Sequence, residues 1–133
     1  GRPDKIVVNI AGDGCFRMNM NEIATAVRHQ IPVIQVVVNN HVLGMVRQWQ
    51  NLFYGQRYSA TVLNDAVDFV KLAESYGAKG IRVMRKEDIA AAFEQAKKET
   101  KIPTLIEFII DPEELVYPMV KPNGTLEDMI MDC

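Results

Sequence analysis

Short runs of aliphatic, mostly β-branched residues alternate along this chain with segments of helical periodicity. Runs expected to form strands occupy residues 6–11, 33–38, 80–84 and 104–110. The first two are apolar over almost their whole length, which is typical of strands buried on both faces of a parallel sheet. Strands that alternate with helices favour the α/β class, here a parallel sheet with helices on both faces in a three-layer arrangement.

Segments between these runs have the spacing of amphipathic helices. They span residues 16–27, 65–76 and 86–100, and each places its apolar side chains on one stripe. Asn64 or Asp65 is expected to cap the second helix, because both residue types accept hydrogen bonds from free N–H groups at a helix start.

Two segments do not fit the alternation. Residues 41–58 are rich in apolar side chains but contain Gly44 and Gly55, so we expect a partly helical segment that packs on something absent from this chain. Residues 112–133 contain prolines and show no sustained period, which indicates a C-terminal tail. We predict a single partial domain over residues 1–133 that ends in this tail.

The composition excludes several classes of protein. The 133 residues are 48% hydrophobic and 24% charged, as expected for one globular domain. The net charge of -2 gives no basic field for nucleic acid, and no apolar run approaches the roughly 20 residues of a membrane span. Cys15 and Cys133 form neither a disulfide framework nor a zinc pattern, which fits a reducing compartment. We expect a cytoplasmic protein without a signal peptide that binds neither nucleic acid nor membrane.

Polar residues follow the first two strands at the point where each strand ends. Gly12-Asp13-Gly14 follows one strand and Asn39-Asn40 follows the next. Right-handed crossovers would place Asp13 and Asn40 at the same carboxyl edge of a parallel sheet, where ligands of such sheets bind. Carboxylate and carboxamide oxygens suit Mg²⁺, which keeps open positions for water and phosphate oxygens. The paired loops therefore predict a diphosphate held through magnesium.

The residues beside Asp13 suit a bound diphosphate. Gly12 and Gly14 would let the chain turn sharply and let phosphate approach the backbone. A helix that begins near Cys15 would direct free N–H groups and its positive dipole end toward the phosphates. Each motif alone is a common turn or loop, so the prediction depends on their pairing at two strand ends.

The sequence around both loops resembles a known family. Residues 12–19 read GDGCFRMN and residues 39–49 read NNHVLGMVRQW. They resemble the thiamine diphosphate signature of 2-keto-acid carboligases and decarboxylases, and more narrowly that of the large catalytic subunit of acetolactate synthase. Residues 117–122 are similar to the C-terminal ending of that subunit. The resemblance runs essentially end to end and implies the later part of its last domain, a partial thiamine diphosphate-binding fold.

Matched by position, the resemblance implies roles for residues of both loops. Asp13 and Asn40 match the side-chain ligands of Mg²⁺, and Val42 matches a ligand that uses its main-chain oxygen. Trp49, with Val46 and Met45 beside it, matches the pocket for the second substrate. No residue of this chain matches a catalytic acid or base. Cofactor-binding positions are Gly12, Gly14, Cys15, Leu43, Gly44 and Met45.

The resemblance also implies an activity. It implies decarboxylation of pyruvate and carboligation to a second 2-keto acid, pyruvate or 2-ketobutyrate, in bacterial branched-chain amino acid biosynthesis. The complete enzyme is expected to use thiamine diphosphate and Mg²⁺, to bind FAD in a domain absent from this chain, and to form a homodimer with a small regulatory subunit. The fragment alone is expected to be inactive.

Two alternatives stay open. One is another thiamine diphosphate enzyme, such as glyoxylate carboligase or pyruvate oxidase, although Arg47-Gln48-Trp49 favours acetolactate synthase. The other is a non-catalytic α/β module of response-regulator type that binds Mg²⁺ through Asp13. Such a module would have an acidic cluster near the ion, whereas the second loop of this chain offers amides.

Overall fold

The computed structural model describes residues 2, 4–63 and 67–131. The chain divides into two compact units, which are described separately. The sheet unit comprises residues 1–40 and 64–110, and the α3 unit comprises residues 41–63 and 111–133. The prediction of a single partial domain stays a prediction.

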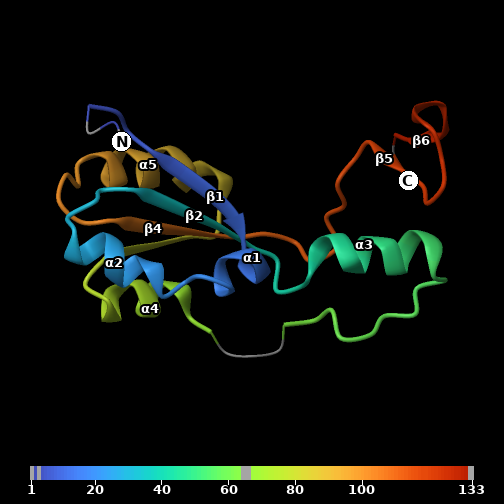
Figure 1. Cartoon of the computed structure of the whole chain (residues 1–133), viewed down its shortest axis with the longest axis horizontal. Coiled ribbons are helices and arrows are strands. Elements are labelled where there is room, and N and C mark those ends of the chain that lie inside the picture. The colour runs from blue at the N-terminus through green and yellow to red at the C-terminus, as the bar shows by residue number, and fades with distance from the viewer. Residues whose placement is uncertain (1, 3, 64–66, 132–133) are drawn as a thin grey trace. The chain divides into compact units, whose positions relative to one another are not determined.

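The sheet unit contains a four-stranded parallel sheet with the strand order β1-β2-β4-β3 (Figure 1). In the register, Gly12 pairs with Val38, and Val38 pairs with Phe108. The observed sheet confirms the predicted α/β class. Its strands are β1 (Val8–Gly12), β2 (Ile34–Asn39), β3 (Lys79–Val83) and β4 (Thr104–Ile109).

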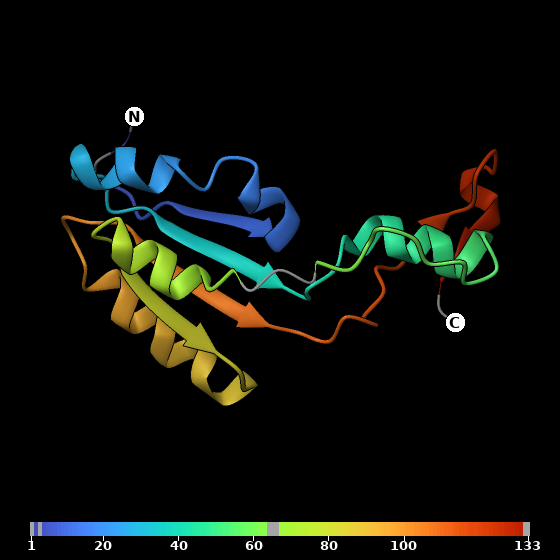
Figure 2. The same ribbon diagram turned by 90° about the horizontal axis from the view of Figure 1, so that it is seen from below.

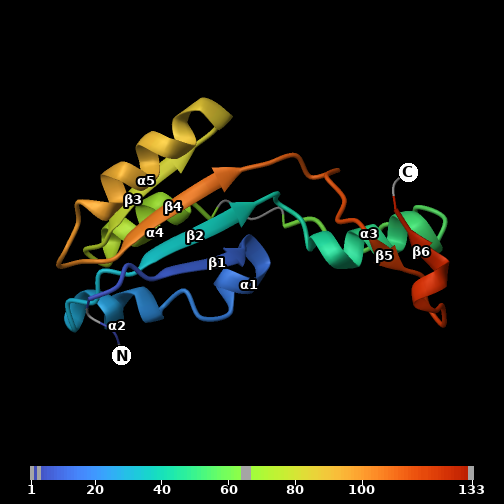
Figure 3. The same ribbon diagram turned by 90° about the horizontal axis from the view of Figure 1, so that it is seen from above.

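Helices cover both faces of this sheet, as Figures 2 and 3 show from opposite sides. The helices α1 (Asp13–Arg17), α2 (Glu22–Arg28) and α4 (Phe69–Ser75) contribute to one buried cluster, and α5 (Ile89–Lys97) contributes to the other. The two clusters confirm the predicted three layers. The first contains Phe16, Ile23, Val37, Phe69, Ala73, Ala78 and Leu105, and the second contains Ile34, Val36, Val83, Ala92, Ala96 and Ile106.

The predicted helix over residues 16–27 is wrong in its continuity, because a turn separates α1 from α2. Asn19 and Asn21 lie in this turn, and asparagine side chains compete with helical backbone hydrogen bonds. Phe16 and Ile23 still reach the same cluster from the two short helices. The apolar stripe thus identified the buried face but not the break.

The other predicted helices begin later than expected. Asp68 caps α4, since its carboxylate accepts a hydrogen bond from the Lys71 backbone N–H at 3.1 Å. The predicted caps, Asn64 and Asp65, lie outside the described residues. A 3-10 turn, η1 (Lys86–Asp88), precedes α5.

The prediction that the first strand is buried on both faces is wrong for this chain. Among the described residues β1 pairs with β2 alone and forms an edge of the sheet. Val8 and Ile10 are 42% and 68% exposed. An apolar run indicates that a strand is suited to burial, but it does not identify the residues that would pack against it.

The α3 unit is built on the helix α3 (Gly44–Phe53). An antiparallel bridge joins Val42 to Val62, and the Leu43 N–H donates to the Thr61 carbonyl at 2.8 Å. The predicted partly helical segment is therefore confirmed. The C-terminal segment contains the antiparallel pair β5 (Met119–Val120) and β6 (Met129–Ile130) and the 3-10 turn η2 (Leu126–Asp128). Across the described parts of both units, every helix is too short or too polar to cross a bilayer.

Candidate functional site

Asp13 presents a buried carboxylate at the end of β1. It is the first residue of α1 and is only 2% exposed. Its Oδ1 accepts a hydrogen bond from the Gly14 backbone N–H at 2.9 Å. Its Oδ2 is buried and accepts no hydrogen bond from any described residue. A buried carboxylate oxygen without a partner is costly, so this atom fits a ligand of a cation.

Asn40 lies at the same edge of the sheet as Asp13. Gly12 is the last residue of β1 and pairs with Val38, and β2 ends at Asn39. Asp13 and Asn40 are therefore the first residues after two neighbouring strands. Neighbouring strands of a sheet lie about 4.8 Å apart. The structure therefore brings the carboxylate and the carboxamide to adjacent ends of two parallel strands, as their positions after the two apolar runs predicted.

The backbone at Gly12 differs from the prediction of a sharp turn. Its φ of -70° and ψ of 162° are ordinary extended values that any residue adopts. A Cβ built on Gly12 would meet its nearest atom, the Val38 carbonyl oxygen, only at 4.0 Å. Neither backbone strain nor crowding by the described residues therefore requires a glycine at this position. The helix that follows has only five residues, so the expected dipole contribution is small, and Cys15 on it is exposed.

A network of polar side chains begins at Asn39, the residue before Asn40, and continues through the buried Glu107 to Arg82 and Asp68 at the surface. Asn39 donates a hydrogen bond from Nδ2 to Oε1 of Glu107 at 2.7 Å. Arg82 donates from Nε to Oε2 of the same carboxylate at 2.7 Å and from Nη2 to Oδ1 of Asp68 at 2.6 Å. The hydrogen bond to Glu107 raises the pKa of Arg82, and the backbone N–H of Lys71 lowers the pKa of Asp68.

This network of polar side chains was not predicted from the sequence. The available signal was a single glutamate within the apolar run of residues 104–110, together with an arginine in the neighbouring predicted strand. A charged residue in a central strand is rarely fully buried unless it is paired.

In the α3 unit, the predicted ligand Val42 is 4% exposed and is fixed by its bridge to Val62. Leu43 and Gly44 follow it and lead into α3, with Leu43 serving as the residue before the first helical turn. The backbone of this segment is therefore held in place by antiparallel pairing with residues 61–63.

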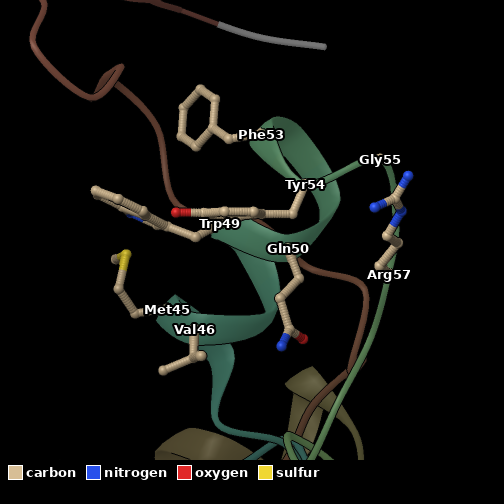
Figure 4. Close-up of a pocket in the computed structure, with 8 residues that line it drawn as sticks. All are labelled: Met45, Val46, Trp49, Gln50, Phe53, Tyr54, Gly55 and Arg57. Carbon is tan, nitrogen blue, oxygen red and sulfur yellow. The ribbon is translucent and has the colours of Figure 1, made fainter.

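One face of α3 lines an open pocket of about 830 Å³ (Figure 4). The Trp49 and Phe53 rings pack edge to face, with centroids 5.6 Å apart. Met45 and Val46 lie one turn earlier and are about half exposed. The structure thus gathers the three predicted substrate-pocket residues on one surface. The pocket is lined by Met45, Val46, Trp49, Gln50, Phe53, Tyr54, Gly55 and Arg57.

Other side chains of α3 bind the C-terminal segment. Gln48 is 1% exposed and forms a two-way amide pair with the backbone of Val116. It donates from Nε2 to the Val116 carbonyl at 2.8 Å and accepts at Oε1 from the Val116 N–H at 2.9 Å. Arg47 forms an ion pair with Glu113 and stacks over the Tyr58 ring, 4.0 Å from its centroid. The predicted tail is therefore anchored to the helix that carries the pocket.

A parallel α/β sheet with polar side chains at its carboxyl edge is typical of domains that bind a ligand or cofactor at that edge. Comparison with known proteins identifies the family to which this domain belongs. Residues 1–108 match the family model described as thiamine pyrophosphate enzyme, C-terminal TPP binding domain. The chain belongs to this family. In the solved structures, it resembles the Rhodococcus jostii RHA1 thiamine diphosphate-dependent 4-hydroxybenzoylformate decarboxylase, with a TM-score of 0.75 and 31% identity over 82% of this chain and 20% of that chain.

Curated relatives narrow the similarity to acetolactate synthase. The chain is 40% identical to the acetolactate synthase large subunit of Haemophilus influenzae over 129 residues, which are 97% of this chain and 22% of the relative. It is 44% identical to the probable acetolactate synthase large subunit of Methanocaldococcus jannaschii with the same coverage. It is 42% identical to the isozyme 2 large subunit of Escherichia coli, covering 97% of this chain and 23% of the relative. The chain spans about a fifth of the length of these relatives.

Proposed function

We propose that this chain is the cofactor-anchoring part of an acetolactate synthase large subunit. The similarity to relatives of that name extends over 97% of the chain. The complete enzyme would decarboxylate pyruvate and join the remaining two-carbon unit to pyruvate or 2-ketobutyrate. This reaction would serve branched-chain amino acid synthesis in the cytoplasm.

The single observation that carries the proposal is the orphaned Oδ2 of Asp13 at the sheet edge that Asn40 shares. A carboxylate oxygen and a carboxamide oxygen suit Mg²⁺. The resemblance to acetolactate synthase implies the main-chain oxygen of Val42 as a third ligand. Gly12 has no side chain and would let a diphosphate approach the backbone closely. The same resemblance implies that Gly14, Cys15, Leu43, Gly44 and Met45 would contact that diphosphate.

Thiamine diphosphate, when bound, supplies the thiazolium ring on which decarboxylation and carbon–carbon bond formation depend. The share of this chain is to hold the diphosphate and to shape the pocket. Trp49, Val46 and Met45 would contact the second 2-keto acid, where one additional methylene is worth about 1–3 kcal/mol of discrimination. No side chain of this chain is assigned acid or base work, so the chain alone is expected to be inactive.

The proposed enzyme has partners outside this chain. FAD would bind a different domain of the complete subunit, two such subunits would form a homodimer, and a small regulatory subunit would bind them. These expectations derive from the resemblance to the acetolactate synthase family.

The test uses the complete enzyme with Mn²⁺ as a spectroscopic substitute for Mg²⁺. Asp13→Ala should abolish Mn²⁺ binding in the presence of thiamine diphosphate, as measured by electron paramagnetic resonance. Wild-type enzyme should convert pyruvate, alone or with 2-ketobutyrate, to acetohydroxyacids. Preferential use of glyoxylate would instead assign the chain to a different carboligase, and unchanged Mn²⁺ binding by the variant would remove Asp13 from the site.

A further inference from the structure

Glu107 is an unusual residue for its place in the fold. It lies in β4, which pairs with β2 on one side and with β3 on the other, and it is 1% exposed. An ionised carboxylate in such a position is costly unless both oxygens are paired. A well-packed apolar residue would serve a merely structural purpose at least as well. The presence of Glu107 therefore needs a reason beyond packing.

Both oxygens of Glu107 are used, and they have different tasks. Oε2 accepts a hydrogen bond from Nε of Arg82, and the positive guanidinium compensates the buried negative charge of Glu107. Oε1 accepts a hydrogen bond from Nδ2 of Asn39, and this contact fixes the orientation of the Asn39 carboxamide. The Asn39 carbonyl also accepts a hydrogen bond from the Ile110 N–H at 3.0 Å, so side chain and backbone are both held by the β4 segment.

The outer end of the chain of contacts is also fixed. The Nη2 of Arg82 binds Asp68, and Asp68 in turn caps α4 through the Lys71 N–H. The guanidinium is thus oriented from two sides, although its side chain is 39% exposed. The contacts run without interruption from the start of α4 to the last residue of β2.

We propose that Glu107, oriented by Arg82 and Asp68, is a positioning residue for the metal loop. By holding the Asn39 carboxamide, it sets the direction in which the chain leaves β2 and hence where Asn40 presents its oxygen. This inference rests on the proposed function, because it treats Asn40 as a ligand of Mg²⁺. Outer partners that orient metal ligands typically change metal affinity about 10- to 100-fold when they are removed.

The experiment measures Mn²⁺ affinity of the complete enzyme with thiamine diphosphate present, and melting temperature in parallel. Glu107→Gln keeps the volume, but its amide can accept from only one partner and must turn a donor toward the other. We expect affinity to fall about tenfold, at the low end of that range. Arg82→Gln removes a partly exposed partner of Glu107 and should also weaken Mn²⁺ binding, by about threefold. This corresponds to about half of the change in binding free energy expected for Glu107→Gln.

A matched control is available on β2. Gln35 is buried and accepts a hydrogen bond from Asn9 at 2.7 Å, but it lies at the start of β2, far along the strand from Asn40. Gln35→Met should lower the melting temperature and leave Mn²⁺ affinity unchanged.

Two results would overturn the inference in different ways. If Glu107→Gln and Arg82→Gln bind Mn²⁺ like wild type while melting at lower temperature, the network is only structural. If Gln35→Met weakens binding as much as they do, the effect reflects general loss of stability. Failure of the proposed metal site itself would be recognised separately, since Asp13→Ala would then bind Mn²⁺ normally.

Discussion

Replacing Gln48 with leucine tests how the C-terminal segment is held on α3. Leucine has a similar size but removes both hydrogen bonds to the Val116 backbone, at 2.8 and 2.9 Å. A neutral hydrogen bond contributes about 1 kcal/mol. Val116 is exposed and both hydrogen bonds are only partly buried, so the larger cost of a fully buried backbone group without a partner is not added. The expected loss is therefore about 2 kcal/mol for this local contact.

Amide hydrogen exchange measures this loss directly. A change of about 2 kcal/mol corresponds to roughly 30-fold faster exchange of the Val116 amide. Glu113→Gln is the control, because it removes only the ion pair to Arg47, whose glutamate is more than half exposed. Such pairs contribute about 0.5 kcal/mol, so exchange should rise only about twofold. Equal acceleration in both variants, or none in Gln48→Leu, would refute the argument that the amide pair is the anchor.

Three further predictions concern other parts of the chain. Gly80→Ala should lower the free energy of unfolding by about 1–3 kcal/mol in denaturant titrations, because the new Cβ would lie 2.9 Å from the Val70 carbonyl oxygen; an unchanged midpoint would contradict this. The pKa of Asp68 is lowered from 3.8, chiefly by the Lys71 N–H, so its stabilising contribution is present above that value and is lost as the pH falls through the folded pKa. The difference in melting temperature between pH 6 and pH 3 should therefore be smaller in Asp68→Asn than in wild type, and an equal difference would count against the shift. Trp49→Leu in the complete enzyme should lower the product ratio of 2-ketobutyrate over pyruvate up to about tenfold in competition assays, and a constant ratio would exclude Trp49 from specificity.

The strands and the edge could be predicted because they depend on local patterns. A β-branched run followed by a polar loop identifies a strand and the end at which ligands bind, and this placed Asp13 and Asn40 correctly at one edge. The break between α1 and α2 was missed, because the apolar stripe continues through a turn in which Asn19 and Asn21 disfavour helix.

Long-range polar contacts could not be predicted from the sequence. Asn39 and Glu107 are 68 residues apart in sequence, and so are Gln48 and Val116. No spacing rule links residues so far apart, because the strand order and the path of the C-terminal segment decide which of them meet. The exposure of β1 was missed for a related reason, because an apolar strand indicates a preference for burial but does not identify the segment that packs against it.

The open side of β1 has a practical consequence for anyone who expresses this chain alone. Within the part of the chain that the structure describes, the outer edge of β1 has no paired strand, and Val8 and Ile10 on this strand are exposed. Such an edge is a template for aggregation. We expect the polypeptide to self-associate on concentration whether or not thiamine diphosphate is supplied. Charged substitutions along that strand would then improve its solubility without changing Asp13 or Asn40, the proposed ligands of Mg²⁺.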